Sequence, residues 1–369
     1  MIFMFEVHTR DWIIKLNPES HPDELVVEVA STCNMNCLHC FRKSAKELEP
    51  SNMDMQLFEK VLNEGIKSGV KKIVFTGWGE PFTHPRLDYI VRICKKHRLE
   101  VAINTNGLLL GEFMDLIVDY VDELYISLDA ATAQMHSYIR APKVFSYIIK
   151  SVEELTKVKQ ERGSLKPYLK ALFTVTKVNV NEIEGLQSLT RDLGFNEVVF
   201  SFSIPYNSID DAGCLSSIEC IDSFFLKLRE AMSKLREIGL GITTPHTLYK
   251  PGTRCPFATN RALFIRSDGA ITPCIYYAYS WSPSIFGIRR NVKAVVLGYI
   301  GKDNLIDVWR KKYAKMFYKL SLRRSIPSCL ACTLVEYCIK TRSNEVDCLG
   351  NEPNCGHCPF YHNLTFCPL

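Results

Sequence analysis

The sequence predicts an α/β fold: a partial (β/α)6 parallel barrel followed by a C-terminal cysteine-rich domain. Two observations predict it. Between residues 25 and 240, short β-rich apolar runs alternate with segments of helical spacing, which favours parallel strands with right-handed crossovers. Beyond residue 240, prolines break this alternation and nine of the 15 cysteines follow. Six strand–helix units are too few to close an eight-stranded barrel, so we expect the barrel to stay open.

The expected elements follow one another along the chain. Strands are predicted at 25–30, 72–76, 101–104, 124–128, 169–176 and 198–202. Helices are predicted at 55–67, 87–97, 111–120, 145–161, 181–193 and 218–238. Past the break we expect a hairpin at 263–274 and a helix at 305–320. The expected domains are an N-terminal extension (1–24), the partial barrel (25–240) and the cysteine-rich domain (241–369).

Composition excludes several classes of protein. Hydrophobic residues make up 47% and charged residues 23% of the 369-residue chain, which are ordinary globular values. The net charge of +5 is too mild to indicate a nucleic-acid partner. No apolar run reaches the roughly 18 residues of a membrane span, and residues 1–10 lack the pattern of a signal peptide. We therefore expect a cytoplasmic protein with no nucleic-acid or membrane partner.

The cysteines are the abnormal feature of the composition. Disulfides require an oxidising compartment, and the odd count of 15 argues against a fully paired framework. Thiolates that hold metal are the better interpretation, with disulfides and inert buried thiols as the alternatives. Cys94, Cys214 and Cys220 stand apart from the other cysteines and are expected to be ordinary side chains.

The first cysteine motif is Cys33-x3-Cys37-x2-Cys40, directly after the first predicted strand. Functional loops of parallel barrels follow the carboxyl ends of the strands, so we expect this loop at the barrel mouth. Three thiolates can bind three irons of a 4Fe–4S cluster and leave the fourth iron open. Zinc is the competing metal, but a closed zinc site takes four ligands, often in C-x2-C pairs.

This motif after the first strand of a partial barrel resembles that of the radical S-adenosylmethionine (SAM) enzymes. The resemblance implies a catalytic 4Fe–4S cluster on Cys33, Cys37 and Cys40, whose open iron chelates the amino and carboxylate groups of SAM. It implies that reductive cleavage of SAM gives a 5′-deoxyadenosyl radical, which takes a hydrogen atom from the substrate. It also implies a reductant such as ferredoxin or flavodoxin as partner. In such enzymes the protein supplies position and exclusion of water.

Further segments at the strand ends resemble the SAM-binding segments of that family. Residues 77–81 (Gly-Trp-Gly-Glu-Pro) resemble its Gly-Gly-Glu-Pro segment, with Trp78 in place of the first glycine. Residues 104–107 and 127–129 resemble its ribose-side loops, and Arg140 resembles an arginine that meets the SAM carboxylate. The resemblance implies SAM contacts at Gly79, Glu80, Thr105, Asn106, Ser127, Asp129 and Arg140.

The C-terminal cysteines resemble the SPASM extension of radical SAM enzymes, which carries one or two auxiliary iron–sulfur clusters. The shared pattern is a cysteine, a Gly-x4-Cys pair at 269–274, and C-x2-C-x5-C at 329–338. The resemblance implies metal ligands at Cys255, Cys274, Cys329, Cys332, Cys338, Cys348, Cys355, Cys358 and Cys367.

This chain departs from the SPASM pattern after Cys338, so the cysteines of each cluster are not assigned from the sequence. Nine residues separate Cys338 from Cys348, where the family usually has three, and the C-x2-C pair at 355–358 is additional. A zinc ribbon on the two C-x2-C pairs, 329–332 and 355–358, is the alternative, because 22 residues separate the pairs.

Four short segments resemble a smaller group of proteins and bear on the substrate. Residues 40–42, 77–81, 355–360 and 367–368 resemble a group of maturases associated with tungsten-containing aldehyde oxidoreductases. That resemblance implies a protein or pterin-cofactor substrate, in maturation of a tungsten or molybdenum oxidoreductase. The alternatives are a SPASM enzyme that oxidises or cross-links a ribosomal peptide, and a non-enzymatic zinc-binding protein.

Overall fold

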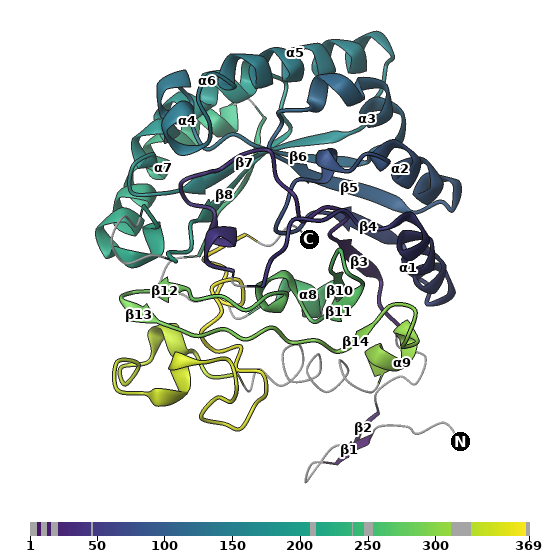
Figure 1. The fold of residues 1–369 in the computed structure, drawn as a ribbon. Coiled ribbons are helices and arrows are strands. Elements are labelled where there is room, and N and C mark those ends of the chain that lie inside the picture. The colour runs from purple at the N-terminus through teal and green to yellow at the C-terminus, as the bar shows by residue number, and fades with distance from the viewer. Residues whose placement is uncertain are drawn as a thin grey trace.

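The computed structural model describes residues 6–8, 13–15, 21–45, 47–206, 212–237, 239–246, 254–310 and 326–366. Within these residues a ten-stranded sheet runs in the order β14-β11-β10-β3-β4-β5-β6-β7-β8-β9. The strands from β10 to β9 in this order pair in parallel, and β11 and β14 are antiparallel. Figure 1 shows the helices from α1 to α7 along the outer face of the curved sheet.

The bounds of the described elements are as follows. The strands are β1 (Glu6–His8), β2 (Ile13–Lys15), β3 (Glu24–Val27), β4 (Lys72–Phe75), β5 (Glu100–Thr105), β6 (Glu123–Ser127), β7 (Tyr168–Val175), β8 (Glu197–Phe202), β9 (Gly241–Thr243), β10 (Ala262–Ile265), β11 (Ala270–Thr272), β12 (Ser284–Ile285), β13 (Ile288–Arg289) and β14 (Gly298–Tyr299). The α-helices are α1 (Met55–Lys67), α2 (Leu87–Lys96), α3 (Met114–Tyr120), α4 (Ala133–Ile139), α5 (Phe145–Glu161), α6 (Leu186–Asp192), α7 (Ile218–Glu237), α8 (Pro256–Thr259) and α9 (Leu305–Val308).

The partial barrel is confirmed, with six predicted strands as β3 to β8. Helices α1 and α5 have the predicted bounds. Helix α1 begins after Asp54, whose carboxylate accepts from the N–H groups of Gln56 and Leu57 and so satisfies two donors of the first turn. Its buried side, which includes Phe58 and Leu62, follows helical spacing.

Some elements differ from the prediction. Helix α4 and strand β9 were not expected, because seven- and three-residue elements are too short to show a clear period. The predicted helix at 305–320 begins as α9, and residues 311–320 lie outside the described residues. Among the described residues, no helix has the length and apolar character needed to cross a membrane.

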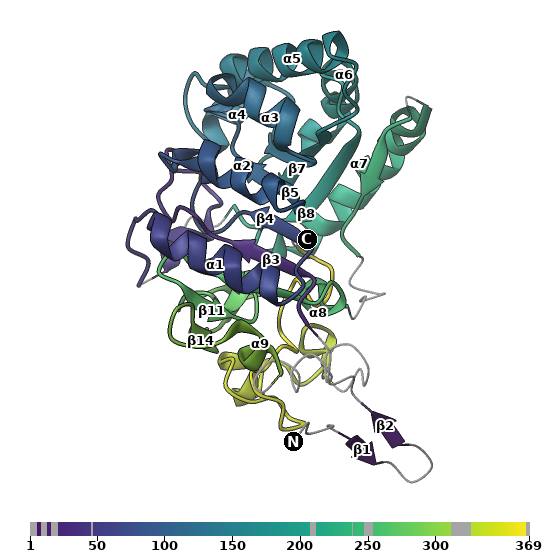
Figure 2. The same cartoon turned by 90° about the vertical axis from the view of Figure 1, so that its right-hand side faces the viewer.

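The cysteine-rich region continues the barrel sheet. Strand β10 pairs in parallel with β3 in the register Leu263 with Leu25 and Ile265 with Val27, and the predicted hairpin with β11 forms beside it. Figure 2 shows β11 and β14 below β3, and the strand order places them in the same sheet. The C-terminal segment also returns to the barrel, since the Phe202 N–H donates to the Leu364 carbonyl at 3.1 Å.

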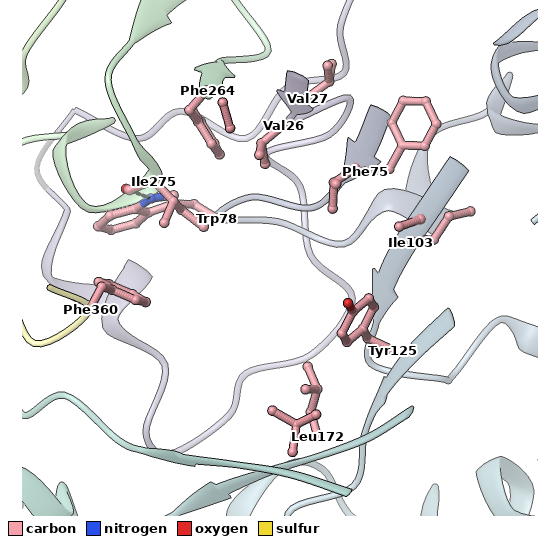
Figure 3. Close-up of a cluster of buried hydrophobic side chains, with 14 of the residues drawn as sticks. Val26, Val27, Phe75, Trp78, Ile103, Tyr125, Leu172, Phe264, Ile275 and Phe360 are labelled. Carbon is pink, nitrogen blue, oxygen red and sulfur yellow. Dashed lines mark hydrogen bonds between the residues drawn. The ribbon is translucent and has the colours of Figure 1, made fainter. Parts of the chain in front are cut away.

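The core lies between the sheet and its covering helices and extends into the barrel interior. Figure 3 shows Trp78, Ile275 and Phe360 gathered on one side of this interior and Leu172 on the other. These four side chains are almost fully buried. The packing thus joins residues from the barrel, the cysteine-rich region and the C-terminal segment around one space.

Candidate functional site

A cavity of about 230 Å³ opens at the carboxyl ends of the barrel strands. Parallel barrels assemble functional side chains at this end because successive loops converge there. The cavity lining includes all three cysteines of the first motif and most of the residues that the sequence assigned to SAM. Those lining residues are Cys33, Cys37, Cys40, Gly79, Glu80, Thr105, Asn106, Ser127 and Arg140.

The loop that carries the three thiols is held on two sides. The Leu38 N–H donates to the carbonyl of Ile139 at 2.7 Å, and the Tyr206 hydroxyl donates to the Leu38 carbonyl at 2.9 Å. On the other side the Asn106 amide donates to Asn34 at 2.7 Å. The loop after β3 is therefore fixed to the loops after β5 and β8 by polar contacts at the cavity rim.

The three thiols suit an iron–sulfur cluster with one open iron. Burial raises the pKa of Cys40 to about 11 and also raises that of Cys37, so the thiolates need positive charge nearby. A metal supplies that charge and deprotonates its thiol ligands. The N–H of Arg42 donates toward the Cys40 sulfur, a contact that also lowers its pKa. Hydrogen bonds to ligand sulfurs are typical of iron–sulfur sites.

Glu80 occupies the floor of this site and is buried. Its carboxylate accepts from the Thr105 hydroxyl at 2.8 Å, the Asn106 N–H at 2.7 Å and the Phe82 N–H at 3.1 Å. Burial raises the pKa of Glu80 to about 7 despite these donors. A cationic ligand group in the cavity would restore the charged form.

The position before Glu80 has to be glycine because a neighbouring loop lies against it. A Cβ at Gly79 would lie 2.3 Å from the carbonyl oxygen of Ala30 and 2.5 Å from that of Thr32. The Glu80 N–H also donates to the Thr32 carbonyl at 2.8 Å. Close approach of two backbones, which only glycine permits, therefore holds the 77–81 loop against the loop that begins the cysteine motif.

Trp78, the departure from the family segment, points toward the cysteine-rich region. Its indole Nε1–H donates to the carbonyl of Ile275, next to Cys274, at 3.0 Å. Its ring packs edge-on against Phe41, next to Cys40, with ring centroids 4.6 Å apart. Trp78 thus contacts residues beside a cysteine of the first motif and a cysteine of the second.

Asp129 and Arg140, both assigned to SAM by resemblance, form a buried ion pair with each other. The Arg140 guanidinium donates through Nε at 2.7 Å and lies at 2.6 Å through Nη2 from one carboxylate oxygen of Asp129. Burial raises the pKa of Asp129, but Arg140 and His39 outweigh it and keep that pKa below its usual value. The third nitrogen, Nη1, lies 3.9 Å from the Cys37 sulfur. Arg140 therefore retains one donor that faces the thiol loop.

Sequence reasoning missed part of the cavity wall. His39, between two motif cysteines, lines the cavity, as do Phe360, Thr365 and Phe366 from the C-terminal segment. The Phe366 N–H donates to the Ser201 hydroxyl at 2.9 Å, and the Thr365 hydroxyl donates to the Phe202 carbonyl at 2.9 Å. No local sequence signal places a C-terminal segment against β8, because such pairing depends on the whole fold.

The cysteine-rich region forms a first thiol group, defined as Cys255, Cys274, Cys355 and Cys358. Burial raises the pKa of each of these thiols, to about 11 for Cys255 and to about 12 for Cys358. Beyond burial, the neighbouring thiols raise the pKa of Cys274 and Cys355 further. These mutual effects place the four sulfurs around one buried region.

Backbone N–H groups point at three members of the first thiol group. In each case they belong to the residues two and three positions after the cysteine, and they lower its pKa. The donor residues are Phe257 and Ala258 for Cys255, Tyr276 and Tyr277 for Cys274, and Phe360 and Tyr361 for Cys358. This repeated pattern suits cysteines whose sulfurs ligate an iron–sulfur cluster.

A second thiol group is defined as Cys329, Cys332, Cys338 and Cys348. Burial raises the pKa of Cys329 to about 12, and Cys348 and Cys338 are among the neighbours that raise it. Cys332 follows in the same turn, since its N–H donates to the Cys329 carbonyl at 3.5 Å. The two groups adjoin, because the Cys329 N–H donates to the Gly356 carbonyl at 2.9 Å. Cys367 lies outside the described residues.

The thiols do not form a ready single-ion site. In the part of the chain that the structure describes, no three His, Cys, Asp or Glu side chains form a group that could hold one metal ion. Zinc would draw its thiolates to about 2.3 Å from one centre, whereas a cluster takes one thiolate for each iron and keeps the sulfurs apart. The pairs 329–332 and 355–358 also fall into different thiol groups, which disfavours the zinc ribbon.

One cysteine prediction was wrong. Cys214 and Cys220, expected to be ordinary side chains, form a disulfide. The turn Cys214–Ser216 and the start of α7 bring their Cα atoms to 5.5 Å, a separation that a disulfide spans. Cys94 is a free buried thiol, as expected.

The fold and site define a partial-barrel enzyme with a thiol triplet at the carboxyl ends of its strands. The Radical SAM superfamily profile matches residues 27–186, and the profile of the SPASM iron–sulfur cluster-binding domain matches residues 255–333. The chain belongs to the radical SAM superfamily and carries a SPASM domain. It is therefore an enzyme whose cofactors are a 4Fe–4S cluster and SAM, with auxiliary iron–sulfur binding in the SPASM domain.

Three proteins illustrate the similarity. The tungsten-containing aldehyde ferredoxin oxidoreductase cofactor-modifying protein of Pyrococcus furiosus is 29% identical over 94% of this chain and 97% of its own length. The GTP 3′,8-cyclase of Chlorobaculum tepidum is 31% identical over 73% of this chain and 84% of its own. The fold resembles that of Streptococcus suis SuiB bound to its precursor peptide SuiA, with a TM-score of 0.59 and 17% identity over 86% of this chain and 71% of SuiB.

Proposed function

We propose that this chain is a radical SAM maturase that acts on a tungsten– or molybdenum–pterin oxidoreductase or on its cofactor. The observation that carries the proposal is the similarity to the Pyrococcus furiosus cofactor-modifying protein, which spans both domains and nearly the whole length of each chain. The residues of the cavity and of the two thiol groups support the chemistry, and the substrate class rests on that similarity.

In this proposal Cys33, Cys37 and Cys40 bind the catalytic cluster. When bound, the cluster and SAM supply a 5′-deoxyadenosyl radical that removes a hydrogen atom from the substrate. Glu80 receives the SAM ammonium, since its buried carboxylate favours a cationic neighbour. Arg140 donates from its remaining Nη1 to the SAM carboxylate, while Asp129 fixes the guanidinium plane.

The remaining residues of the cavity orient SAM, and the aromatic ones among them exclude water. Gly79, Thr105, Asn106 and Ser127 line the cavity from three strand ends, which matches a ligand that extends across several loops. Phe360 and Phe366 close the cavity from the C-terminal segment with apolar surface. A reactive radical requires such exclusion of solvent.

We assign one auxiliary 4Fe–4S cluster to each thiol group of the cysteine-rich region. The assignment uses eight cysteines in two sets of four and leaves Cys367 outside both. For the first group it is supported by burial, by the mutual effects among the thiols and by the downstream N–H groups. For the second it is supported by the turn at 329–332 and by the neighbours of Cys329.

The reductant in this proposal is a small ferredoxin or flavodoxin, because SAM cleavage consumes one low-potential electron. The compartment is the cytoplasm, where thiols stay reduced and available to metal. Twelve of the described cysteines are free and only the neighbouring pair Cys214 and Cys220 is joined, so most thiols are available to metal.

The test is anaerobic reconstitution with iron and sulfide, followed by incubation with SAM, a strong reductant and a candidate substrate. The candidates are a tungsten oxidoreductase lacking its mature cofactor, the isolated pterin cofactor, and a short precursor peptide encoded near the gene. We expect a mass change, or a gain of oxidoreductase activity, with one of the first two candidates. A mass change on the peptide alone would replace the maturase by a peptide-modifying enzyme.

A further inference from the structure

Arg290 is a buried cation that lacks an anionic partner among the residues that the structure describes. It follows strand β13 and is only 1% exposed. Nη1 donates to the carbonyls of Ile288 at 3.1 Å and Ile285 at 3.4 Å. Within the described part of the chain, Nε and Nη2 have no hydrogen-bond partner. Among the described residues, no carboxylate forms an ion pair with this guanidinium.

Such an arrangement is costly unless an anion is bound nearby. A buried charge without a counter-charge strongly destabilises a folded protein, and buried N–H groups nearly always have an acceptor. Arginine does not avoid this cost by losing its proton, because a guanidinium is not deprotonated in proteins. Two nitrogens without an acceptor on one buried guanidinium therefore indicate a missing anionic acceptor.

The surroundings of Arg290 identify that acceptor by class. Burial lowers the pKa of Arg290, and Tyr276 and Cys329 are the neighbours that counteract burial most. Reciprocally, Arg290 lowers the pKa of Cys329, which burial raises. Cys329 belongs to the second thiol group, whose exposed edge carries Cys332 and Cys348. A thiolate-ligated iron–sulfur cluster is anionic, and its sulfur atoms accept hydrogen bonds.

The carboxylate of Asp347, a neighbour of Cys329, already has hydrogen-bond partners. Asp347 is buried, and its oxygens accept from the N–H groups of Leu349 and Asn351 at 2.8 Å and from the Asn351 amide at 2.7 Å. The Asn291 N–H, next to Arg290, donates to the carbonyl of Arg342 at 2.7 Å, but the Arg342 side chain itself is exposed to water. The buried positive charge of Arg290 is thus left for an anion beside Cys329.

We propose that Arg290 is the buried counter-ion of the auxiliary cluster on the second thiol group and raises the reduction potential of that cluster. The inference rests on the auxiliary clusters of the proposed function. A fixed positive charge favours the state that holds an additional electron, and N–H donors to sulfur act in the same direction. Arg290 is a positioning and tuning residue and not a ligand.

The test is a redox titration followed by electron paramagnetic resonance on reconstituted full-length protein. The variants are Arg290→Met, which removes the charge, and Arg290→Lys, which keeps it. The control is Arg342→Gln, which removes a nearby charge that is exposed to water and therefore screened. Iron content and thermal unfolding are measured on every sample.

For Arg290→Met we expect the reduction equilibrium of one auxiliary cluster to fall at least tenfold, which is about 59 mV for a one-electron couple. The other clusters and the Arg342→Gln variant should change less than twofold. If Arg290→Met loses that cluster, Arg290→Lys should retain it, which also supports the counter-ion. An unchanged potential at full iron content, an equal shift in Arg342→Gln, or loss of the cluster in Arg290→Lys would each overturn the inference.

A wrong assignment of the auxiliary clusters would give a different result from a wrong role for Arg290. Wild-type protein with only about four irons would show that the auxiliary assignment is wrong, and the inference about Arg290 would be overturned with it. Twelve irons with an insensitive potential would instead leave the clusters in place and refute the role of Arg290 alone.

Discussion

The barrel mouth and the cysteine-rich region bring their thiols together by two different structural routes. At the mouth, three thiols lie within eight consecutive residues of one loop, which contacts with the loops after β5 and β8 hold in place. In the cysteine-rich region, the first thiol group gathers cysteines from 255 to 358 along the chain. The first site is local in sequence and the second is made by the tertiary fold.

This difference affects what the metal does for stability. The barrel strands and helices bury most of the core between them, and the loop at 33–40 adds Met35 to it. The region from 326 to 366 contains only short turns such as Cys329–Ala331 and Ile339–Arg342. In loop-rich segments of this kind, metal binding contributes folding free energy directly. Loss of metal should therefore abolish the activity of the first site and unfold the chain around the second.

The largest expected effect is at the barrel mouth. Replacement of Cys33, Cys37 or Cys40 by alanine should abolish 5′-deoxyadenosine formation, because each thiolate binds a different iron. Thermal unfolding of the barrel should change little. The measurement is product formation by chromatography after anaerobic reconstitution.

Cys94→Ala is the matched control for those variants. Its thiol is free and buried in α2, so its loss should cost packing without touching the cluster. Full SAM cleavage in any one of the three motif variants would contradict the assignment of the catalytic cluster.

The next effect concerns iron content and folding of the cysteine-rich region. Wild type should carry about twelve irons, at four for each 4Fe–4S cluster. The double variants Cys355→Ser/Cys358→Ser and Cys338→Ser/Cys348→Ser should each carry about eight, and removal of all tail cysteines should leave about four. Each should cleave SAM slowly, and the affected segment should become sensitive to protease.

Zinc analysis of the same samples separates the alternatives. A zinc ribbon on 329–332 and 355–358 would lose its zinc in the first double variant and keep it in the second. One or more tightly held zincs with about four irons in wild type would refute the auxiliary clusters.

The same contrast explains what could be predicted from the sequence. The bounds of α1 and α5 follow from apolar spacing within each helix, and the motif at 33–40 follows from local spacing after β3. Both are local properties that a sequence displays directly. The partial barrel was therefore predictable.

Long-range contacts could not be predicted from the sequence. The parallel pairing of β10 with β3 joins Leu263 to Leu25, and the sequence of neither strand indicates which strand it pairs with. Likewise the spacing of the tail cysteines fitted a zinc ribbon or two clusters, and the fold places Cys355 with Cys274. Arg140, read as a SAM contact, has a local partner in Asp129 that the sequence did not indicate.

A smaller effect is expected from Glu80→Gln, which tests the barrel site without removing a ligand. Charge-assisted hydrogen bonds contribute about 1.5–3 kcal/mol, so SAM affinity should fall roughly ten- to a hundredfold. Isothermal titration of reconstituted protein measures it. An unchanged dissociation constant would count against a role in SAM binding.

The pH dependence of stability checks the charge state of Glu80 independently. Its pKa is raised from 4.5 to about 7, so the folded state keeps a proton that the unfolded state loses. The stability of the SAM-free wild type relative to Glu80→Gln should thus be greatest below about pH 4.5 and fall as the pH rises to about 7. Denaturant unfolding of both proteins at several pH values measures this difference, and a flat difference would show an ordinary pKa.

The smallest expected effect sharpens the comparison most, because it lies between the two regions. Trp78→Phe removes the hydrogen bond from the barrel loop to the Ile275 carbonyl and keeps an aromatic ring. Trp281→Phe is the matched control, because its indole donates to the Tyr276 carbonyl within the cysteine-rich region at 3.1 Å. Each variant should lose about 1 kcal/mol of unfolding free energy.

Only Trp78→Phe should also uncouple the two sites. Because Trp78 and Glu80 share one loop, loss of the first auxiliary cluster through Cys355→Ser/Cys358→Ser should weaken SAM binding several-fold in the wild-type background. In the Trp78→Phe background that additional loss should shrink to less than twofold, whereas Trp281→Phe should leave it intact. SAM dissociation constants for these combinations form a double-mutant cycle, which isolates the interaction between the sites. Equal coupling energies in all backgrounds would show that the two regions bind their cofactors independently and that Trp78 serves packing alone.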